Sequence, residues 1–230
     1  MPLLFSRRVS PEATFAVWQI AEPEVFFRDK LPLSAAEALE LEGLKDPRRM
    51  EWLACRWLLH AITGATQRLP VAKDAFSKPF FMDRPDLYCS LSHSHGLVGA
   101  LFSSRNSGCD LQVQVDKMPL IAPRFLNAAE LDFIQKHPVA AHLDLFHLFW
   151  TMKESLYKAY GLKEVDFKTQ LLISPFAWNG QEGEADAKVV KNDFQQAYRL
   201  RFEKNRLPQS EELEGGYEES GKAFYWTVAQ

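Results

Sequence analysis

A carboxylate and an ammonium group that could act together lie on a helix-forming stretch in the middle of the chain, LFHLFWTMKESLYKAYG. Its polar and aromatic residues recur at steps of three and four and are His147, Trp150, Glu154, Tyr157 and Lys158. This spacing places them on one helical face and brings Glu154 within reach of Lys158. A solvated ion pair is the ordinary explanation. The aromatic residues instead favour a packed face, on which a buried carboxylate must be paired or bind a metal.

Two oxygen-bearing side chains share one face of a predicted strand over residues 109–115. The strict alternation of this segment predicts a buried face formed by Cys109, Leu111, Val113 and Val115. The other face presents Asp110 and Gln112, about 7 Å apart at Cα. Both can converge on one hard cation, although polar outward faces of edge strands are common.

Cationic side chains that could bind an anion occur earlier in the chain. Arg49 and Arg56 lie along one edge of a helix predicted to run to about Thr63, either as a phosphate grip or as arginines that cover apolar surface. Lys78 precedes Pro79, and proline disfavours helix in its predecessor, so Lys78 projects from an extended or turn segment.

The cluster Ser92-His93-Ser94-His95-Gly96 is predicted at a turn between two strands, over residues 87–91 and 97–102. Such a cluster can be a metal site, a hydrolase nucleophile pair, an anion nest or a plain turn. No G-x-S-x-G elbow surrounds either serine, which argues against the hydrolase. The other three alternatives remain open from these residues alone.

Taken together, four separated segments resemble the motifs of the 4′-phosphopantetheinyl transferases, in the same order. They are the helix with Arg49 and Arg56, the K-P and S-H-S pair, G-x-D-x-Q where the family has G-x-D-x-E, and W-x-x-K-E-S-x-x-K where it has W-x-x-K-E-A-x-x-K. The resemblance spans residues 49–161 and is to the long, single-chain type. It implies transfer of 4′-phosphopantetheine from coenzyme A to a serine of an acyl or peptidyl carrier protein, with release of adenosine 3′,5′-bisphosphate.

The resemblance also implies roles for individual residues. Asp110 and Glu154 would hold Mg²⁺, with Gln112 or a water that it orients in another place, and Glu154 or a metal-bound water would take the serine proton. For coenzyme A, the resemblance implies that Lys158 and His93 bind the pyrophosphate and that Arg49, Arg56 and Lys78 bind the 3′-phosphate and adenine end. Ser92 and Pro79 are also implied to bind coenzyme A.

Gln112 is the main departure from the family pattern. An amide offers one carbonyl oxygen but no charge, which weakens a magnesium site. The alternative function is therefore a non-catalytic protein of the same fold that binds coenzyme A or a carrier protein. A third possibility is an unrelated α+β protein in which the polar residues of the helix around Glu154 have no catalytic role.

The sequence predicts both helices and strands around these residues, and therefore an α+β fold. Strands are expected over residues 14–20, 167–173, 196–202 and 223–229, in addition to those already named, and EELEGGYEES is an acidic loop. Helices are expected over residues 24–30, after the capping pair Ser34 and Glu37, after Asn127, and up to Gly161. The resemblance implies two pseudo-symmetric α+β halves, residues 1–105 and 106–230, with the ligand site between them.

Composition narrows the class of protein further. The 230 residues include 27 Lys and Arg against 30 Asp and Glu, a net charge of −3 without a basic tail, which argues against a nucleic-acid binder. Cys55, Cys89 and Cys109 have no metal-like spacing and predict buried thiols in a reducing compartment. No signal peptide or membrane span is recognisable, so a cytoplasmic protein is expected. A monomer is also expected.

Overall fold

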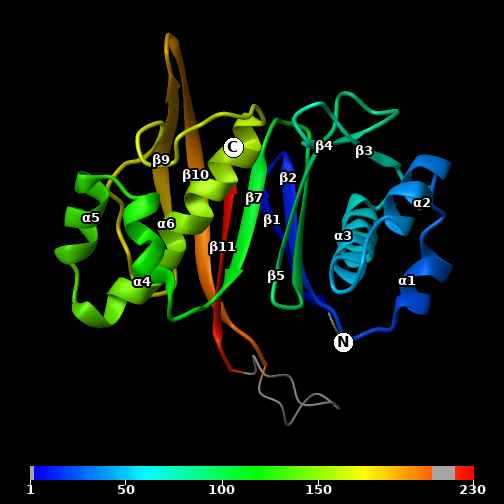
Figure 1. The fold of residues 1–230 in the computed structure, drawn as a ribbon, viewed down its shortest axis with the longest axis horizontal. Helices are drawn as coiled ribbons and strands as arrows, with labels where there is room; N and C mark the ends of the chain where they lie inside the picture. Colours follow the sequence, from blue (N-terminus) through cyan, green and yellow to red (C-terminus); the bar gives the residue numbers. More distant parts are fainter. Residues whose placement is uncertain (1–2, 209–220) are drawn as a thin grey trace. The chain divides into compact units, whose positions relative to one another are not determined.

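The chain folds into two compact units, Met1–Cys109 and Asp110–Gln230. The computed structural model describes residues 3–208 and 221–230. The acidic loop EELEGGYEES lies outside the described residues. Each unit combines helices with an antiparallel sheet (Figure 1), which confirms the α+β class. Pseudo-symmetry between the halves stays a prediction.

The first unit is built on a six-stranded sheet in the order β1-β2-β6-β5-β4-β3. Its strands are β1 (Leu3–Ser10), β2 (Ala13–Gln19), β3 (Val71–Lys73), β4 (Pro79–Phe81), β5 (Tyr88–Ser94) and β6 (Leu97–Ser103). Its helices are α1 (Glu24–Lys30), α2 (Ala35–Glu42) and α3 (Arg48–Thr63). Helix α3 packs on β2, β5 and β6 and lies between this sheet and α1.

The buried face of α3 includes a charged residue that the sequence placed on an accessible edge. Arg56 is only 3% exposed; its guanidinium lies 3.4 Å from the centre of the Trp52 ring and donates to Glu40 at 3.1 Å. Glu37 lies 3.6 Å from Arg56 Nε. The expectation of an accessible edge is wrong for Arg56, because two carboxylates of α2 neutralise it inside the unit.

The polar cluster between β5 and β6 also differs from its prediction. Ser92, His93 and Ser94 belong to β5 and pair in register with Gly99, Val98 and Leu97. The turn consists of His95 and Gly96 alone, both with positive φ, as two-residue hairpin turns require. His93 therefore projects from a rigid strand rather than from a loop.

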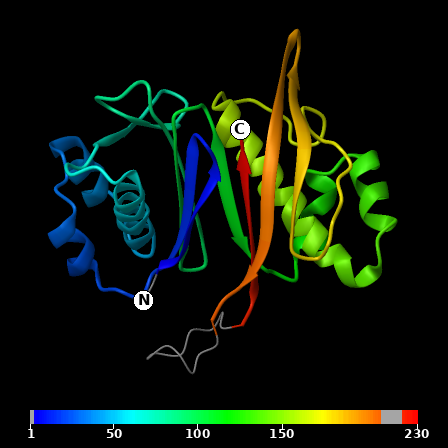
Figure 2. The same cartoon turned by 180° about the vertical axis from the view of Figure 1, so that it is seen from behind.

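The second unit is built on a five-stranded sheet in the order β7-β11-β10-β9-β8. Its strands are β7 (Gly108–Val113), β8 (Leu171–Ile173), β9 (Glu182–Lys191), β10 (Phe194–Arg206) and β11 (Ala223–Ala229). Its helices are α4 (Met118–Ile121), the 3₁₀ turn η1 (Ala122–Arg124), α5 (Ala128–Gln135) and α6 (Val139–Tyr160). Strands β9 and β10 form a long hairpin, seen from behind in Figure 2.

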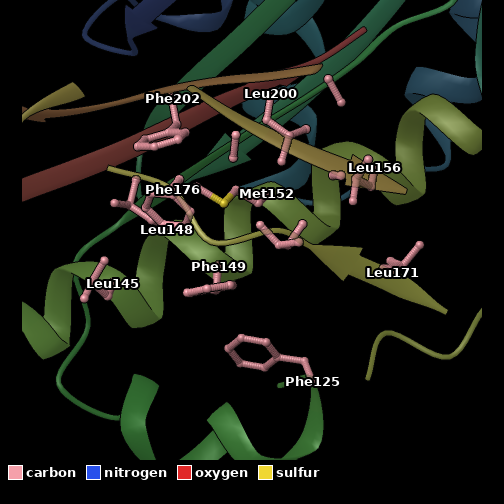
Figure 3. Close-up of a cluster of buried hydrophobic side chains, with 14 of the residues drawn as sticks. Phe125, Leu145, Leu148, Phe149, Met152, Leu156, Leu171, Phe176, Leu200 and Phe202 are labelled. Carbon is pink, nitrogen blue, oxygen red and sulfur yellow. The ribbon is translucent and has the colours of Figure 1, made fainter. Parts of the chain in front are cut away.

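Helix α6 supplies the centre of the second core. Its side chains Leu145, Leu148, Phe149, Met152 and Leu156 are at most 1% exposed. Figure 3 shows them facing residues from the surrounding elements, among them Phe125, Leu171, Phe176, Leu200 and Phe202. The helix ends where Gly161 adopts φ 74°, as the glycine predicted. Among the described residues, no helix is long and apolar enough to cross a membrane.

A buried ion pair ties α6 to two neighbouring segments. Lys153 is 0% exposed, and its Nζ lies 2.7 Å from Glu130 and donates to the carbonyl of Phe167 at 2.7 Å. Glu130 is the third helical residue of the Asn127 capping box and also accepts from the amide of Ile173. One lysine therefore joins α5, α6 and the segment before β8.

We expect Lys153→Met to destabilise the protein by about 3–5 kcal/mol, because Glu130 would stay buried without its counter-charge. Chemical denaturation measures this free energy of unfolding. The double variant Lys153→Met with Glu130→Gln should recover part of the loss. Arg199→Met is the control, since Arg199 is 56% exposed beside Glu184, and it should cost about 0.5 kcal/mol or less. Equal losses in both lysine and arginine variants would contradict the buried pair.

Candidate functional site

Asp110, Glu154 and Lys158 form one charged cluster in the second unit. Asp110 comes from β7, while Glu154 and Lys158 lie one turn apart on α6. Lys158 Nζ donates to Asp110 Oδ1 at 2.7 Å. Burial, together with the nearby Asp110 carboxylate, raises the pKa of Glu154 to about 7, and Lys158 opposes this shift. The cluster holds two carboxylates against one ammonium, as the sequence pattern suggested.

This donor set fits a hard divalent cation. A cation between Asp110 and Glu154 would offset both the burial of the Glu154 carboxylate, which is the larger cause of its raised pKa, and its repulsion by Asp110. The amide nitrogen of Gln112 donates to the carbonyl of Val113 at 2.9 Å, so its carbonyl oxygen is the atom that could serve as a ligand. Within residues 3–208 and 221–230, no three His, Cys, Asp or Glu side chains group as a metal site. Two carboxylates and one amide are thus the proposed set.

The aromatic residues on the same helix face are packed, as the sequence indicated. Trp150 contacts Phe125 and Phe167, with ring centroids 5.1 and 6.1 Å away, and Tyr157 contacts Phe167 at 5.5 Å. These rings hold the segment after α6 against the helix. They explain how Glu154, beside them, is partly removed from water.

The cationic residues predicted in the first unit lie in separate environments. Arg49 Nε lies 3.2 Å from Glu24 and 3.8 Å from Asp46, and its side chain is 31% exposed. Lys78 Nζ donates to Asn106 at 2.6 Å, and burial lowers the pKa of Lys78, opposed by Asp74. Pro79 begins β4, and Ser92, on β5, is buried. The structure therefore does not join Arg49 and Arg56 into one strip of cations, because Arg56 is buried.

His93 instead lies beside residues that the sequence did not single out. Its Nε2 is 2.9 Å from Arg48 Nη1, and its Nδ1 is 3.1 Å from Glu51. Arg48 and Glu51 lie three residues apart in the first turn of α3. The three-residue spacing of Arg48 and Glu51 could have indicated that they share a helical face. Only the packing of α3 on β5 decides that Arg48, rather than Arg49, contacts His93.

Comparison with known proteins agrees with the geometry of the second unit. Residues 107–214 match the family model of the 4′-phosphopantetheinyl transferase superfamily. This stretch contains Asp110, Gln112, Glu154 and Lys158. The segment from residue 107 to residue 214 belongs to the 4′-phosphopantetheinyl transferase superfamily. This match confirms the resemblance to the superfamily over the segment that contains the last two of the four motifs.

Individual members of the superfamily match over part of their length. A 4′-phosphopantetheinyl transferase of Bacillus subtilis is 32% identical over 87 residues, which is 37% of this chain and 38% of the relative. The transferase Sfp of Bacillus subtilis strain 168 is 31% identical over 86 residues, with the same coverage. The transferase gsp of Aneurinibacillus migulanus is 27% identical over 112 residues, 48% of this chain and 46% of the relative. Each match therefore spans less than half of the relative.

The pKa of Glu154 predicts how stability depends on pH. Its folded-state pKa of about 7 exceeds the ordinary 4.5, so its favourable contribution is fully present below about pH 4.5 and is lost as pH rises through 7. Glu154→Gln stays neutral and should be more stable than the wild type at pH 8 by about 1–2 kcal/mol. Near pH 4.5 the difference should vanish.

Denaturant unfolding at pH 4.5, 6, 7 and 8 measures this difference. Glu42→Gln is the matched control, because it removes the same charge from an exposed position on α2. A Glu154→Gln difference that stays constant across this pH range would show that Glu154 does not titrate near neutrality in the folded protein.

Proposed function

We propose that this protein transfers 4′-phosphopantetheine from coenzyme A to a serine of an acyl or peptidyl carrier protein and releases adenosine 3′,5′-bisphosphate. The observation that carries the proposal is the Asp110, Glu154 and Lys158 cluster, which lies within the segment that belongs to the superfamily. The three buried free thiols suit a reducing compartment such as the cytoplasm.

The reaction joins the serine oxygen to the β-phosphorus of coenzyme A and breaks the bond from that phosphorus to the oxygen bridging the two phosphates. The hydroxyl proton leaves the serine, and the bridging oxygen departs with adenosine 3′,5′-bisphosphate. Mg²⁺, held by Asp110, Glu154 and Gln112, supplies positive charge beside the phosphate oxygens when it is bound. Glu154 or a metal-bound water is proposed to accept the proton, since both would lie beside the attacking hydroxyl.

Lys158 has a place in this chemistry because its present partner is also a proposed metal ligand. Its ammonium lies 2.7 Å from Asp110 and is 26% exposed. If Asp110 holds a cation, the ammonium of Lys158 would be available to bind a phosphate oxygen of coenzyme A. Positive charge then lies on two sides of the pyrophosphate, where negative charge develops on the leaving group.

The cations of the first unit are proposed to bind the phosphates of coenzyme A. Arg48 and His93 are hydrogen-bonded to each other, and Arg49 and Lys78 are partly exposed, so their donors can meet an anion. The guanidinium group of Arg48 suits an anion, since its planar donors match phosphate oxygens. Arg56 keeps its ion pairs with α2 and supports the helix that carries Arg48 and Arg49.

The proposal is tested by incubating the protein with coenzyme A, Mg²⁺ and several apo carrier proteins. The intact mass of each carrier is then measured by mass spectrometry. The expected result is a mass gain of one phosphopantetheine on the cognate carrier. Glu154→Gln should abolish transfer while the protein stays folded, because a neutral amide replaces both a ligand and the base. Glu42→Gln should leave the transfer rate unchanged. Wild-type turnover by Glu154→Gln would refute the role of this cluster.

Gln112 favours a second candidate, a protein that binds coenzyme A or a carrier protein without turnover. If the transferase proposal holds, Gln112→Glu should lower the Mg²⁺ concentration needed for half-maximal transfer by restoring a charge to the site. A Mg²⁺ titration of the transfer rate measures this. A wild type that binds coenzyme A but transfers to no carrier, and that gains activity with Gln112→Glu, would establish the binding protein instead.

A further inference from the structure

His147 lies outside the charged cluster, yet it contacts the segment that continues from the strand carrying Asp110 and Gln112. The ring is 0% exposed and stacks on Tyr225, with centroids 4.8 Å apart. Its Nε2 is 2.9 Å from the amide nitrogen of Val115, two residues beyond the end of β7. Its Nδ1 is 2.7 Å from the carbonyl oxygen of Leu143, one turn earlier on α6.

These two contacts assign the tautomer of His147. The amide of Val115 can only donate, so Nε2 must be the acceptor, and the carbonyl of Leu143 can only accept, so Nδ1 must carry the hydrogen. The ring is therefore neutral in this arrangement. Adding a proton to Nε2 would remove the acceptor and break the link to Val115.

The charges around the ring are compatible with this neutral state. Burial lowers the pKa of His147, opposed by its bond to Leu143 and by Asp144 and Asp116, while Lys204 lowers it further. Lys204 is itself paired with Asp144 at 2.6 Å, and Tyr225 donates to the other oxygen of Asp144 at 2.6 Å.

The link occupies a particular place between two site-bearing elements. Asp110 contacts Lys158 toward the C-terminal end of α6, and Val115 contacts His147 about 10 Å earlier along the helix axis than Glu154. Polar links thus join the strand segment to the helix before and after Glu154 along α6. Residue Gln114, between them, is held to β11 through Ala223 at 2.8 Å.

We propose that His147 is a positioning residue: its bond to the Val115 amide fixes the strand bearing Asp110 and Gln112 against the helix bearing Glu154, and so sets the spacing of the cation ligands. The inference builds on the proposed function, since the cation site is the one used for transfer. His147 itself touches neither substrate nor cation.

Two substitutions of similar polarity separate positioning from packing. His147→Gln has a side chain long enough to place an oxygen near the Val115 amide, whereas His147→Asn can reach the Leu143 carbonyl but is too short to reach Val115. We expect His147→Asn to weaken Mn²⁺ binding at least ten-fold and to lower kcat, as loss of an outer-shell partner does. His147→Gln should remain within about three-fold of the wild type on both measures. Free Mn²⁺ is followed by electron paramagnetic resonance in the presence of coenzyme A.

Thr151→Val is the matched control on the same helix. Thr151 shares a buried hydrogen bond of 2.8 Å with Thr227 of β11, a strand that carries none of the proposed ligands. This variant should lose thermal stability but keep the Mn²⁺ affinity and kcat of the wild type. If His147→Asn does not fold, His147→Phe, which keeps an aromatic ring beside Tyr225 but lacks the acceptor, takes its place.

The outcomes separate this inference from the proposed function. Folded His147→Asn or His147→Phe with wild-type Mn²⁺ affinity and kcat would overturn the positioning role while leaving the transferase intact. Mn²⁺ binding that responds to these variants, in a protein that transfers to no carrier, would overturn the transferase and keep the positioning role. A wild type that neither binds Mn²⁺ nor transfers would overturn both.

Discussion

Two carboxylates, Asp110 and Glu154, held near each other beside the ammonium group of Lys158 are the constraint on which the second unit depends. Asp110 and Glu154 come from a strand and a helix that are distant in sequence, and like charges favour their separation. Burial is the larger cause of the raised pKa of Glu154, and the nearby Asp110 carboxylate raises this pKa further. Such a pair persists only if the surrounding structure fixes both elements, which makes the rigidity of α6 a requirement for the site.

The polar residues of α6 meet this requirement through bonds to different segments. Ser155 donates to the carbonyl of Thr227 on β11 at 2.9 Å, and Lys153 binds the α5 cap and the segment before β8. Buried polar bonds add little net stability, but each specifies one position of the helix, because any shift would leave a buried group unpaired. An all-apolar helix could slide along the sheet, whereas this one is fixed in place.

Local sequence signals predicted the capped ends of three helices, whereas the strands expected over residues 167–173 and 196–202 are observed over Leu171–Ile173 and Phe194–Arg206. The capping boxes at Ser34 and Asn127 and the glycine stop at Gly161 depend on neighbouring residues alone, and all three are present. The sequence did not indicate β1 or β9; β9 has exposed charged residues such as Glu184 and Asp186 between small buried ones. The alternation in β9 was an available local signal, but its small and charged residues have low strand propensity, and the pairing with β10 decides that the strand forms.

The candidate site divides in the same way. Helical periodicity indicated that Glu154 and Lys158 share a face, and the family resemblance implied that Asp110 lies beside them. Arg56 was misplaced because its burial depends on Glu37 and Glu40, contributed by another helix. Arg48 and Glu51 were missed because their partner, His93, lies more than forty residues away in the chain. Periodicity gives the face, and only packing gives the partner.

The repulsion between Asp110 and Glu154 gives a physical reason for an amide, rather than a carboxylate, at Gln112. A glutamate there would add a third carboxylate beside Asp110 and Glu154, and in the cation-free protein one ammonium, Lys158, would face three negative charges. Gln112 instead donates to Val113 and stabilises the strand end locally. If Asp110 and Glu154 hold a cation, the amide lowers both the repulsion among these side chains and, by the same loss of charge, the affinity for that cation, which is the exchange between stability and activity expected where a site concentrates like charges.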